Sequence, residues 1–449
     1  MRPFVGDGAI CVRCGIGCGV VFFSVRPPCD GNINTFNYMA DRNYWKSVWS
    51  KCAVVALLAG GVASCAQAPG RAPIIDENVA VAEQQIAMLA DSSETDGVIR
   101  IPSTYKNGRI DYVPTDDWVS GFFAGTLWYM YELTGDEAWA ARAQKHTEIL
   151  DSIQYLQWHH DVGFMIYDSY GNGLRLKNIP GYREVIVQTA RSLATRFRGV
   201  PGVIQSWDAD RGWQGERGWQ CPVIIDNMMN LELMFKASEF SGDSTFRHIA
   251  VSHADRTMKE HFRDDYSCYH VVDYDLTDGH VRGRCTAQGY ADDSAWARGQ
   301  AWAVYGYTTC YRYTGDKRYL DHAEKVADFM LNDVNMPADL VPYWDYDAPN
   351  IPDEPRDVST AAIIASAFYE MYTYTQNALY REKADKVIES LSSPAYRAPV
   401  GENGGFLLMH SVGSIPHGSN IDVPLNYADY YFLEALIRKA HVDKGEPLF

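Results

Sequence analysis

The stretch Tyr131-Glu-Leu-Thr-Gly-Asp-Glu-Ala-Trp139 joins two helically periodic segments through a tight Gly-Asp turn. Glycine ends helices readily because it adopts left-handed backbone angles, and aspartate is a favoured N-cap for the helix that follows. The pattern returns at Glu239–Phe246 and Tyr313–Tyr319, and in degenerate form at Tyr374–Tyr380. Each copy therefore predicts two antiparallel helices joined by a short loop.

Repetition of helical hairpins predicts an all-α domain over residues 76–449. The unequal spacing of the copies favours a closed α/α barrel with long functional loops at one end over a regular solenoid. One insertion has a different pattern. Tyr269–Arg282 places β-branched and aromatic residues around Asp278-Gly279, which predicts a β-hairpin that carries His270 toward the space the loops enclose.

Composition narrows the function. The chain has 449 residues, 47% of them apolar, and a formal net charge of −17, which argues against a nucleic-acid partner because phosphate binding needs basic surfaces. Its 12 Trp and 29 Tyr suit a cleft that stacks on sugar rings, although many must fill the core. The cysteines are concentrated before residue 66, so the main body is not a disulfide scaffold. No metal or cofactor site is expected, since no cluster shows convincing ligand spacing and Cys11–Cys18 lacks a fold context.

The N-terminal region predicts export. Basic residues precede an apolar run at Cys52–Ala63 that is too short to span a membrane, which takes about 20 residues. Val62-Ala-Ser-Cys65 is typical of a lipobox with Cys65 as the lipidated residue; ordinary cleavage near the same point is the alternative. We expect a signal peptide at 39–65, a tether at 66–75 and, at 1–38, translated sequence upstream of the true start. The predicted location is the bacterial cell envelope, lipid-anchored, on the periplasmic side or the outer surface.

Two carboxylates are the candidate catalytic residues. Asp226 follows the apolar run at Pro222–Ile225 and precedes a helically periodic segment, while Asp161 lies among aromatic residues in Trp158–Phe164. Either one could instead be a helix or loop cap, a common role for aspartate. Polar and aromatic residues downstream favour a catalytic cleft over caps; they are His270, Gln288, Trp296, Arg298 and Trp302.

Three motifs together resemble the unsaturated glucuronyl hydrolases, family 88 of the glycoside hydrolases: His159–Phe164, Ile225–Asn230 and Gln288–Trp302. The resemblance runs from Asp117–Gly125 to Asn426–Ala435. It implies a six-hairpin (α/α)6 barrel that removes 4,5-unsaturated glucuronate from oligosaccharides left by polysaccharide lyases. The family begins by hydrating the C4=C5 double bond, rather than by displacement at the anomeric carbon.

The resemblance also implies roles. Asp226 would be the general acid and base, with a pKa raised by burial and by a nearby like charge, and Asp161 the second essential carboxylate. Other residues would bind the sugar: His270 and Gln288 by polar contact, Arg298 by charge, Trp118, Trp296 and Trp302 as aromatic walls, and His417 and Ser419 at the leaving sugar.

Two alternatives stay open. A related hydrolase of unsaturated rhamnogalacturonan fragments would share the fold and the chemistry, and a glycan-binding lipoprotein would lack the chemistry. The segment Ser411–Asn420 has no lysine, unlike family members that prefer sulfated sugars, so the preferred sulfation pattern also stays open.

Overall fold

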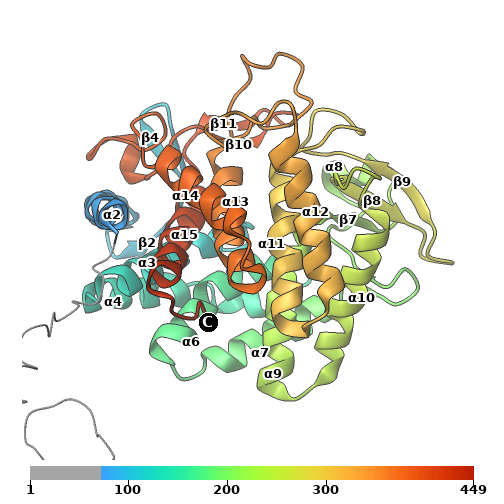
Figure 1. Ribbon diagram of the computed structural model, residues 1–449. Coiled ribbons are helices and arrows are strands. Elements are labelled where there is room, and N and C mark those ends of the chain that lie inside the picture. The colour runs from blue at the N-terminus through green and yellow to red at the C-terminus, as the bar shows by residue number, and fades with distance from the viewer. Residues whose placement is uncertain (1–71) are drawn as a thin grey trace, which may run out of the picture. The chain divides into compact units, whose positions relative to one another are not determined.

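A computed structural model describes residues 72–449 (Figure 1). The predictions for residues 1–38, for the signal peptide at 39–65 and for Cys65 lie outside the described residues. Helix α2 begins at Pro73, and Ile75 is buried in the core. The tether expected at 66–75 is therefore wrong for its last three residues, because the apolar side chain of Ile75 packs into the domain. No helix in the described part of the chain combines the length and apolarity needed to cross a membrane.

Six helical segments follow one another around an inner ring, each in contact with the next, and the ring closes where the last meets the first. They are α3 (Ser120–Thr134), α5 (Val162–Ile166) with its continuation η2 (Tyr167–Gly171), α9 (Leu231–Ser241), α11 (Ala297–Thr314), α13 (Val358–Thr375) and α15 (Asn426–Lys444). Helices α3, α13 and α15 are buried on nearly every side, as expected for helices with neighbours all around.

An outer layer of helices covers this ring. Its members are α2 (Pro73–Ser93), α4 (Glu137–Glu148), α7 (Tyr182–Ala194), α10 (Ser244–Glu260), α12 (Lys317–Asn332) and α14 (Ala378–Leu391). The short helices η1 (Asp151–Tyr155), α6 (Asn172–Lys177), α8 (Gly212–Gly215), η3 (Ile225–Asn230) and η4 (Asn403–Gly405) lie in the connections. The architecture is the expected six-hairpin α/α barrel.

The Gly-Asp turns have the predicted geometry. Gly135, Gly242 and Gly315 take left-handed angles, with φ of 72°, 73° and 69°, and the next aspartate caps the following helix. In the degenerate copy, Asn377 caps α14 in the same way, after Gln376 has adopted the left-handed angle that glycine takes elsewhere. Each turn thus ends an inner helix and starts its outer partner.

Short strands occupy the loops. The predicted hairpin forms β8 (Val271–Tyr274) and β9 (Val281–Cys285), and β8 also pairs with β7 (Pro222–Ile224). In addition to this three-stranded sheet, the described residues form four two-stranded hairpins. They are β1 with β2 (Glu94–Thr95, Val98–Ile99), β3 with β4 (Ile101–Lys106, Arg109–Val113), β5 with β6 (Phe197–Arg198, Val203–Ile204) and β10 with β11 (Ser411–Ser414, Ser419–Val423). The sheet β7-β8-β9 matters most for function, because Asp226 follows β7 and His270 precedes β8.

Candidate active site

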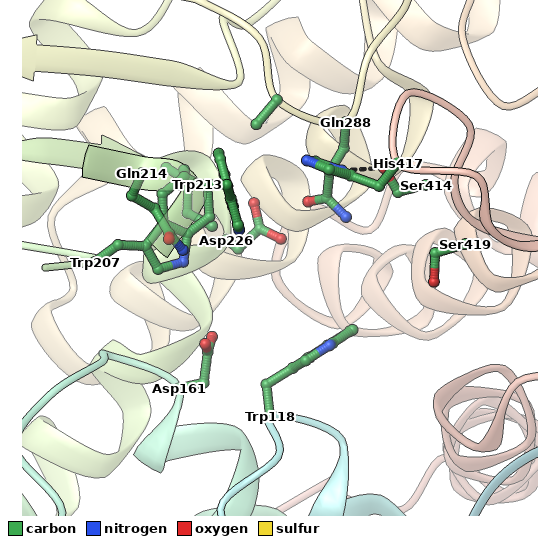
Figure 2. A pocket seen from close by; sticks show the side chains of 12 residues that line it. Trp118, Asp161, Trp207, Trp213, Gln214, Asp226, Gln288, Ser414, His417 and Ser419 are labelled. Carbon is green, nitrogen blue, oxygen red and sulfur yellow. Dashed lines mark hydrogen bonds between the residues drawn. The ribbon is translucent and has the colours of Figure 1, made fainter. Parts of the chain in front are cut away.

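A cavity of about 310 Å³ contains both candidate carboxylates. Asp161 and Asp226 reach it from different elements, with Trp207, Trp213 and Gln214 on one side (Figure 2). Its remaining lining residues are Trp118, Ile224, Ala287, Gln288, Ser414, His417 and Ser419. Six of the ten sugar-contacting and catalytic residues expected from the sequence therefore meet in one space.

Asp226 lies in η3, directly after β7. The Ile225 N–H donates to the carbonyl of His270 at 3.1 Å, which ties the start of η3 to the start of β8. The N-cap positions of η3 and α9 belong to Ile224 and Asn230, so Asp226 is not the helix cap that the alternative reading required. Strand pairing, rather than capping, positions this carboxylate.

His270 faces Asp226 with a defined tautomer. Its Nδ1 accepts hydrogen bonds from the backbone N–H of Ala287 at 2.9 Å and of Gln288 at 3.2 Å. A ring nitrogen that accepts carries no proton, so neutral His270 carries its proton on Nε2, which lies 3.7 Å from Asp226 Oδ2. Neither of these two atoms has a hydrogen-bond partner within residues 72–449, although both are buried. Buried polar atoms are nearly always hydrogen-bonded, so Asp226 Oδ2 and His270 Nε2 are available to bind a ligand.

Burial shifts the protonation of both groups. It raises the pKa of Asp226 to about 7; Asp161 raises the pKa further, while the nearby Arg298 guanidinium opposes the rise. Burial, together with the positive charge of Arg298, lowers the pKa of His270 well below its usual value. Near neutral pH, His270 is neutral and Asp226 exchanges a proton readily, as a general acid and base must.

Asp161 has the opposite character. Burial would raise its pKa, but His160 and His159 outweigh burial and lower the net pKa below the usual value. His160 Nε2 lies 3.3 Å from Asp161 Oδ1, and His159 Nδ1 lies 3.3 Å from Asp161 Oδ2. Asp161 stands at the N-cap position of α5 but makes no side-chain cap hydrogen bond, so a structural capping role is not supported. The cavity thus pairs an ionised carboxylate with one that is half protonated near neutral pH.

Arg298 does not have the role expected from the sequence. It is only 1% exposed, and its guanidinium pairs with Asp357 at 2.9 Å and donates to the carbonyls of Val412 at 2.5 Å and Gly413 at 2.7 Å. These contacts engage both terminal nitrogens of the guanidinium, whereas its Nε has no hydrogen-bond partner within residues 72–449. Arg298 instead ties α11 to β10 and opposes the rise in the pKa of Asp226.

Two of the expected aromatic walls are also core residues. Trp302 is 0% and Trp296 is 3% exposed, and neither lines the cavity. Trp296 packs against His270, with ring centroids 4.6 Å apart, and under the Arg298 guanidinium at 4.7 Å. Trp118 does line the cavity, held by Tyr427 at 5.0 Å between ring centroids. Of the three tryptophans, only Trp118 forms a wall.

Comparison with known proteins agrees with the fold. No family model matches the sequence. An unsaturated glucuronyl hydrolase from Formosa agariphila is 47% identical over 333 residues, which cover 74% of this chain and 82% of that protein. The chain belongs to the unsaturated glucuronyl hydrolase family. An unsaturated chondroitin disaccharide hydrolase from Streptococcus pyogenes serotype M1 is 32% identical over 347 residues, covering 75% of this chain and 84% of its own length.

Solved structures of the family superpose well. A crystal structure of an unsaturated glucuronyl hydrolase specific for heparin matches with a TM-score of 0.78 and 44% identity, covering 82% of this chain and 98% of that one. The glycosaminoglycan-degrading enzyme from Bacillus sp. GL1 matches with a TM-score of 0.74 and 29% identity, covering 83% and 97%. The resemblance inferred from the three sequence motifs is confirmed, and the protein is an enzyme of the glycoside hydrolase type.

Sequence reasoning missed several residues of this enzyme's cavity. Trp207, Trp213 and Gln214 come from the segment between β6 and β7, the last two from its short helix α8, and Ser414 ends β10. Ser414 Oγ lies 2.8 Å from Nδ1 of His417, and Gln288 Nε2 donates to the carbonyl of Gly413 at 3.4 Å. The tryptophan-rich composition of residues 207–219 was the one signal that could have found part of this wall.

A candidate metal cluster lies elsewhere. Within residues 72–449, Asp275, Asp278 and His280 at the β8–β9 turn could place one ligand atom each within 4.8 Å of one another. They are largely exposed, and none lines the catalytic cavity. The cluster is therefore separate from the cavity that holds Asp161 and Asp226.

Proposed function

We propose that this enzyme removes the non-reducing-end 4,5-unsaturated glucuronate from lyase-generated glycosaminoglycan oligosaccharides, by hydration of the C4=C5 double bond. The observation that carries the proposal is Asp226. Its carboxyl group has a pKa of about 7, faces Nε2 of neutral His270 at 3.7 Å and shares its cavity with an ionised Asp161. Protonating an enol-ether carbon requires such an acid, still protonated near neutral pH.

The reaction can be written through Asp226. Its protonated carboxyl group donates a proton to C4, and the positive charge that develops at C5 is stabilised by the ionised Asp161. A water molecule adds to C5 and returns one proton to the Asp226 carboxylate, which restores the starting state. The product is a hemiketal at C5 that opens to a ketone and frees the next sugar.

His270 would orient the water or a sugar hydroxyl. Because its Nδ1 accepts from two backbone donors, Nε2–H is free to donate to a ligand, and it lies 3.7 Å from Asp226 Oδ2. Trp118 would stack on the sugar, since it lines the cavity and its ring is held by Phe122, Phe164 and Tyr427. Arg298 would act through Asp226, as a positioning residue, by limiting the rise of the pKa of Asp226.

Carboxylate pairs in glycosidases normally act on the anomeric carbon, as an acid with a nucleophile or a base. The opposed pKa shifts here suit hydration equally well, because one group must donate a proton and the other must stay ionised. The family's chemistry decides between the two readings in favour of C4 and C5.

The competing substrate class is a pectin-derived unsaturated rhamnogalacturonan fragment. Relatives named for glucuronyl and chondroitin substrates favour the glycosaminoglycan class. The test is to incubate the purified enzyme with unsaturated disaccharides from chondroitin, heparin and rhamnogalacturonan lyases, and to follow the loss of ultraviolet absorbance. The proposal predicts a kcat/KM at least about tenfold higher on a glucuronate substrate. Preference for the rhamnogalacturonan product would reverse the assignment, and binding without turnover would favour a glycan-binding protein.

We also propose that Cys65 carries a lipid anchor and that the enzyme works at the bacterial cell envelope. The support is the basic, apolar and Val-Ala-Ser-Cys order of the sequence before the domain. Cys65→Ala should move the protein from the membrane fraction to the soluble fraction or leave its signal peptide uncleaved. Wild-type protein recovered from the cytoplasm would refute the proposal.

A further inference from the structure

Arg217 is an exposed cation that contacts Trp213, a residue of the cavity wall. Its guanidinium lies over the rings of Trp219 at 5.5 Å and Trp213 at 5.9 Å. It makes no ion pair and no side-chain hydrogen bond with any residue in the described part of the chain. By contrast, Arg211 on the same segment is neutralised by Asp208. In a chain with a net charge of −17, a cation held on two aromatic rings and left unpaired suits an external anion.

The rings place this cation against the cavity wall. Trp213 lines the cavity and contacts His417 from the β10–β11 hairpin, with ring centroids 5.0 Å apart. The positive charge of Arg217 lowers the pKa of His417 and adds to the lowering at His270. Arg217 therefore acts electrostatically on both the rim and the interior of the site.

The leaving sugar has to lie beside this rim. The unsaturated sugar must place C4 and C5 at Asp226, in the interior of the cavity. The sugar it is attached to then lies toward solvent, where Trp213 and Gln214 form one wall and His417 and Ser419 form the other (Figure 2). Trp213 is 37% exposed, so it can present a stacking face there.

We propose that Arg217 recognises a sulfate group on the leaving sugar, with Trp213 and Trp219 holding its guanidinium in place. The inference rests on the proposed function, because it assigns the specificity of the same reaction. A guanidinium presents a planar fork of donors that matches an oxyanion, and stacking on the two rings reduces the conformational entropy lost on binding.

His417 completes the anion site. Its Nδ1 lies 2.8 Å from the Ser414 hydroxyl, and if this hydroxyl donates, neutral His417 carries its proton on Nε2. Nε2–H is then a second donor on the opposite wall. Ser411–Asn420 has no lysine, so in this proposal the cation of the anion site comes from a different segment of the chain.

The experiment compares kcat/KM for lyase-generated disaccharides that differ only in whether the leaving hexosamine carries a sulfate. For each enzyme, the measured quantity is the ratio of sulfated to unsulfated kcat/KM, using the sulfated substrate that the wild type turns over fastest. Arg217→Gln should lower this ratio about tenfold, as expected for losing a charge-assisted contact at a partly exposed site. Arg217→Lys should lower it less, because the charge remains while the fork is lost.

Arg211→Gln is the matched control, since it removes the same charge from the same segment but from an already neutralised side chain. It should leave the ratio within about twofold of the wild-type value. An equal fall in Arg211→Gln and Arg217→Gln, an unchanged ratio in Arg217→Gln, or a wild type that turns over only unsulfated substrates would overturn the inference. Failure of the proposed function is a separate result, in which the wild type turns over no unsaturated glucuronide at all.

Discussion

The substitution Asp226→Asn tests whether Asp226 is the catalytic acid or only a helix cap. Asparagine keeps nearly the same shape but supplies no proton, so kcat/KM should fall by about 10²–10⁴-fold, the usual worth of general acid–base catalysis. If Asp226 were a helix cap, asparagine would serve almost as well, since the two residues rank together as caps. The N-cap positions are held by Ile224 and Asn230, so the structure predicts the large loss.

The same substitution should stabilise the fold at alkaline pH. The pKa of Asp226 is about 7 when folded, against about 3.9 in an unfolded chain, so the folded state binds the extra proton between these values. Stability of the wild type therefore falls as pH rises from about 4 to about 7, by up to about 4 kcal/mol. Asparagine has no such titration. The variant should be more stable than the wild type at pH 8, and the difference should be small at pH 4.

The assay combines turnover, followed by loss of ultraviolet absorbance, with urea unfolding of both proteins at pH 8 and pH 4. Near-normal activity of Asp226→Asn would show that the residue is not the acid. A variant less stable than the wild type at pH 8 would refute the burial argument, because it would mean that the ionised carboxylate is stabilising where it lies.

Two further outcomes follow from the charges around Asp226. The kcat/KM should be limited on the alkaline side by an apparent pKa of about 7, that of Asp226 in the free enzyme, and should fall about tenfold per pH unit above it. The lowered pKa of Asp161 keeps that carboxylate ionised at neutral pH. A kcat/KM profile from about pH 4.5 to about pH 9 that shows no alkaline limb would contradict this. Asp357→Asn removes the charge of the buried partner of Arg298, so the free energy of unfolding should fall by about 3–5 kcal/mol. The uncompensated guanidinium should also lower the pKa of Asp226 further, which moves the alkaline limb to lower pH. Urea unfolding and the pH profile check this, and an unmoved alkaline limb would mean that Arg298 does not act on Asp226.

The barrel was predictable because its signals are local. Two adjacent residues mark where one helix ends and the next begins: Gly135 with Asp136, and the equivalent pairs at residues 242–243 and 315–316. The β-hairpin at 269–282 was predictable for the same reason, as a turn pair flanked by strand formers. The third strand, β7, was not, because its three residues carry no periodicity.

The site was only partly predictable, since its geometry depends on contacts between distant segments. In the sequence, Asp161 stood out by its aromatic neighbours, and Asp226 by its position between an apolar run and a helically periodic segment. Nothing near Arg298 in the sequence indicates that Asp357 will neutralise it, 59 positions later. Trp302 falls within the matched motif yet lies in the core. A sequence motif does not distinguish residues that line a cavity from buried residues that pack behind them. Trp213 lines the cavity from α8, a helix of four residues that is too short to show a periodic pattern in the sequence.

The most direct test of the account is to measure double-bond loss and sugar release together, in the first turnovers of the purified wild-type enzyme on an unsaturated glucuronyl disaccharide. Hydration at C4 and C5 predicts that ultraviolet absorbance disappears no later than the leaving sugar is released, in equal molar amounts. Release of the leaving sugar while the absorbance initially persists would show displacement at the anomeric carbon and contradict the central role proposed for Asp226.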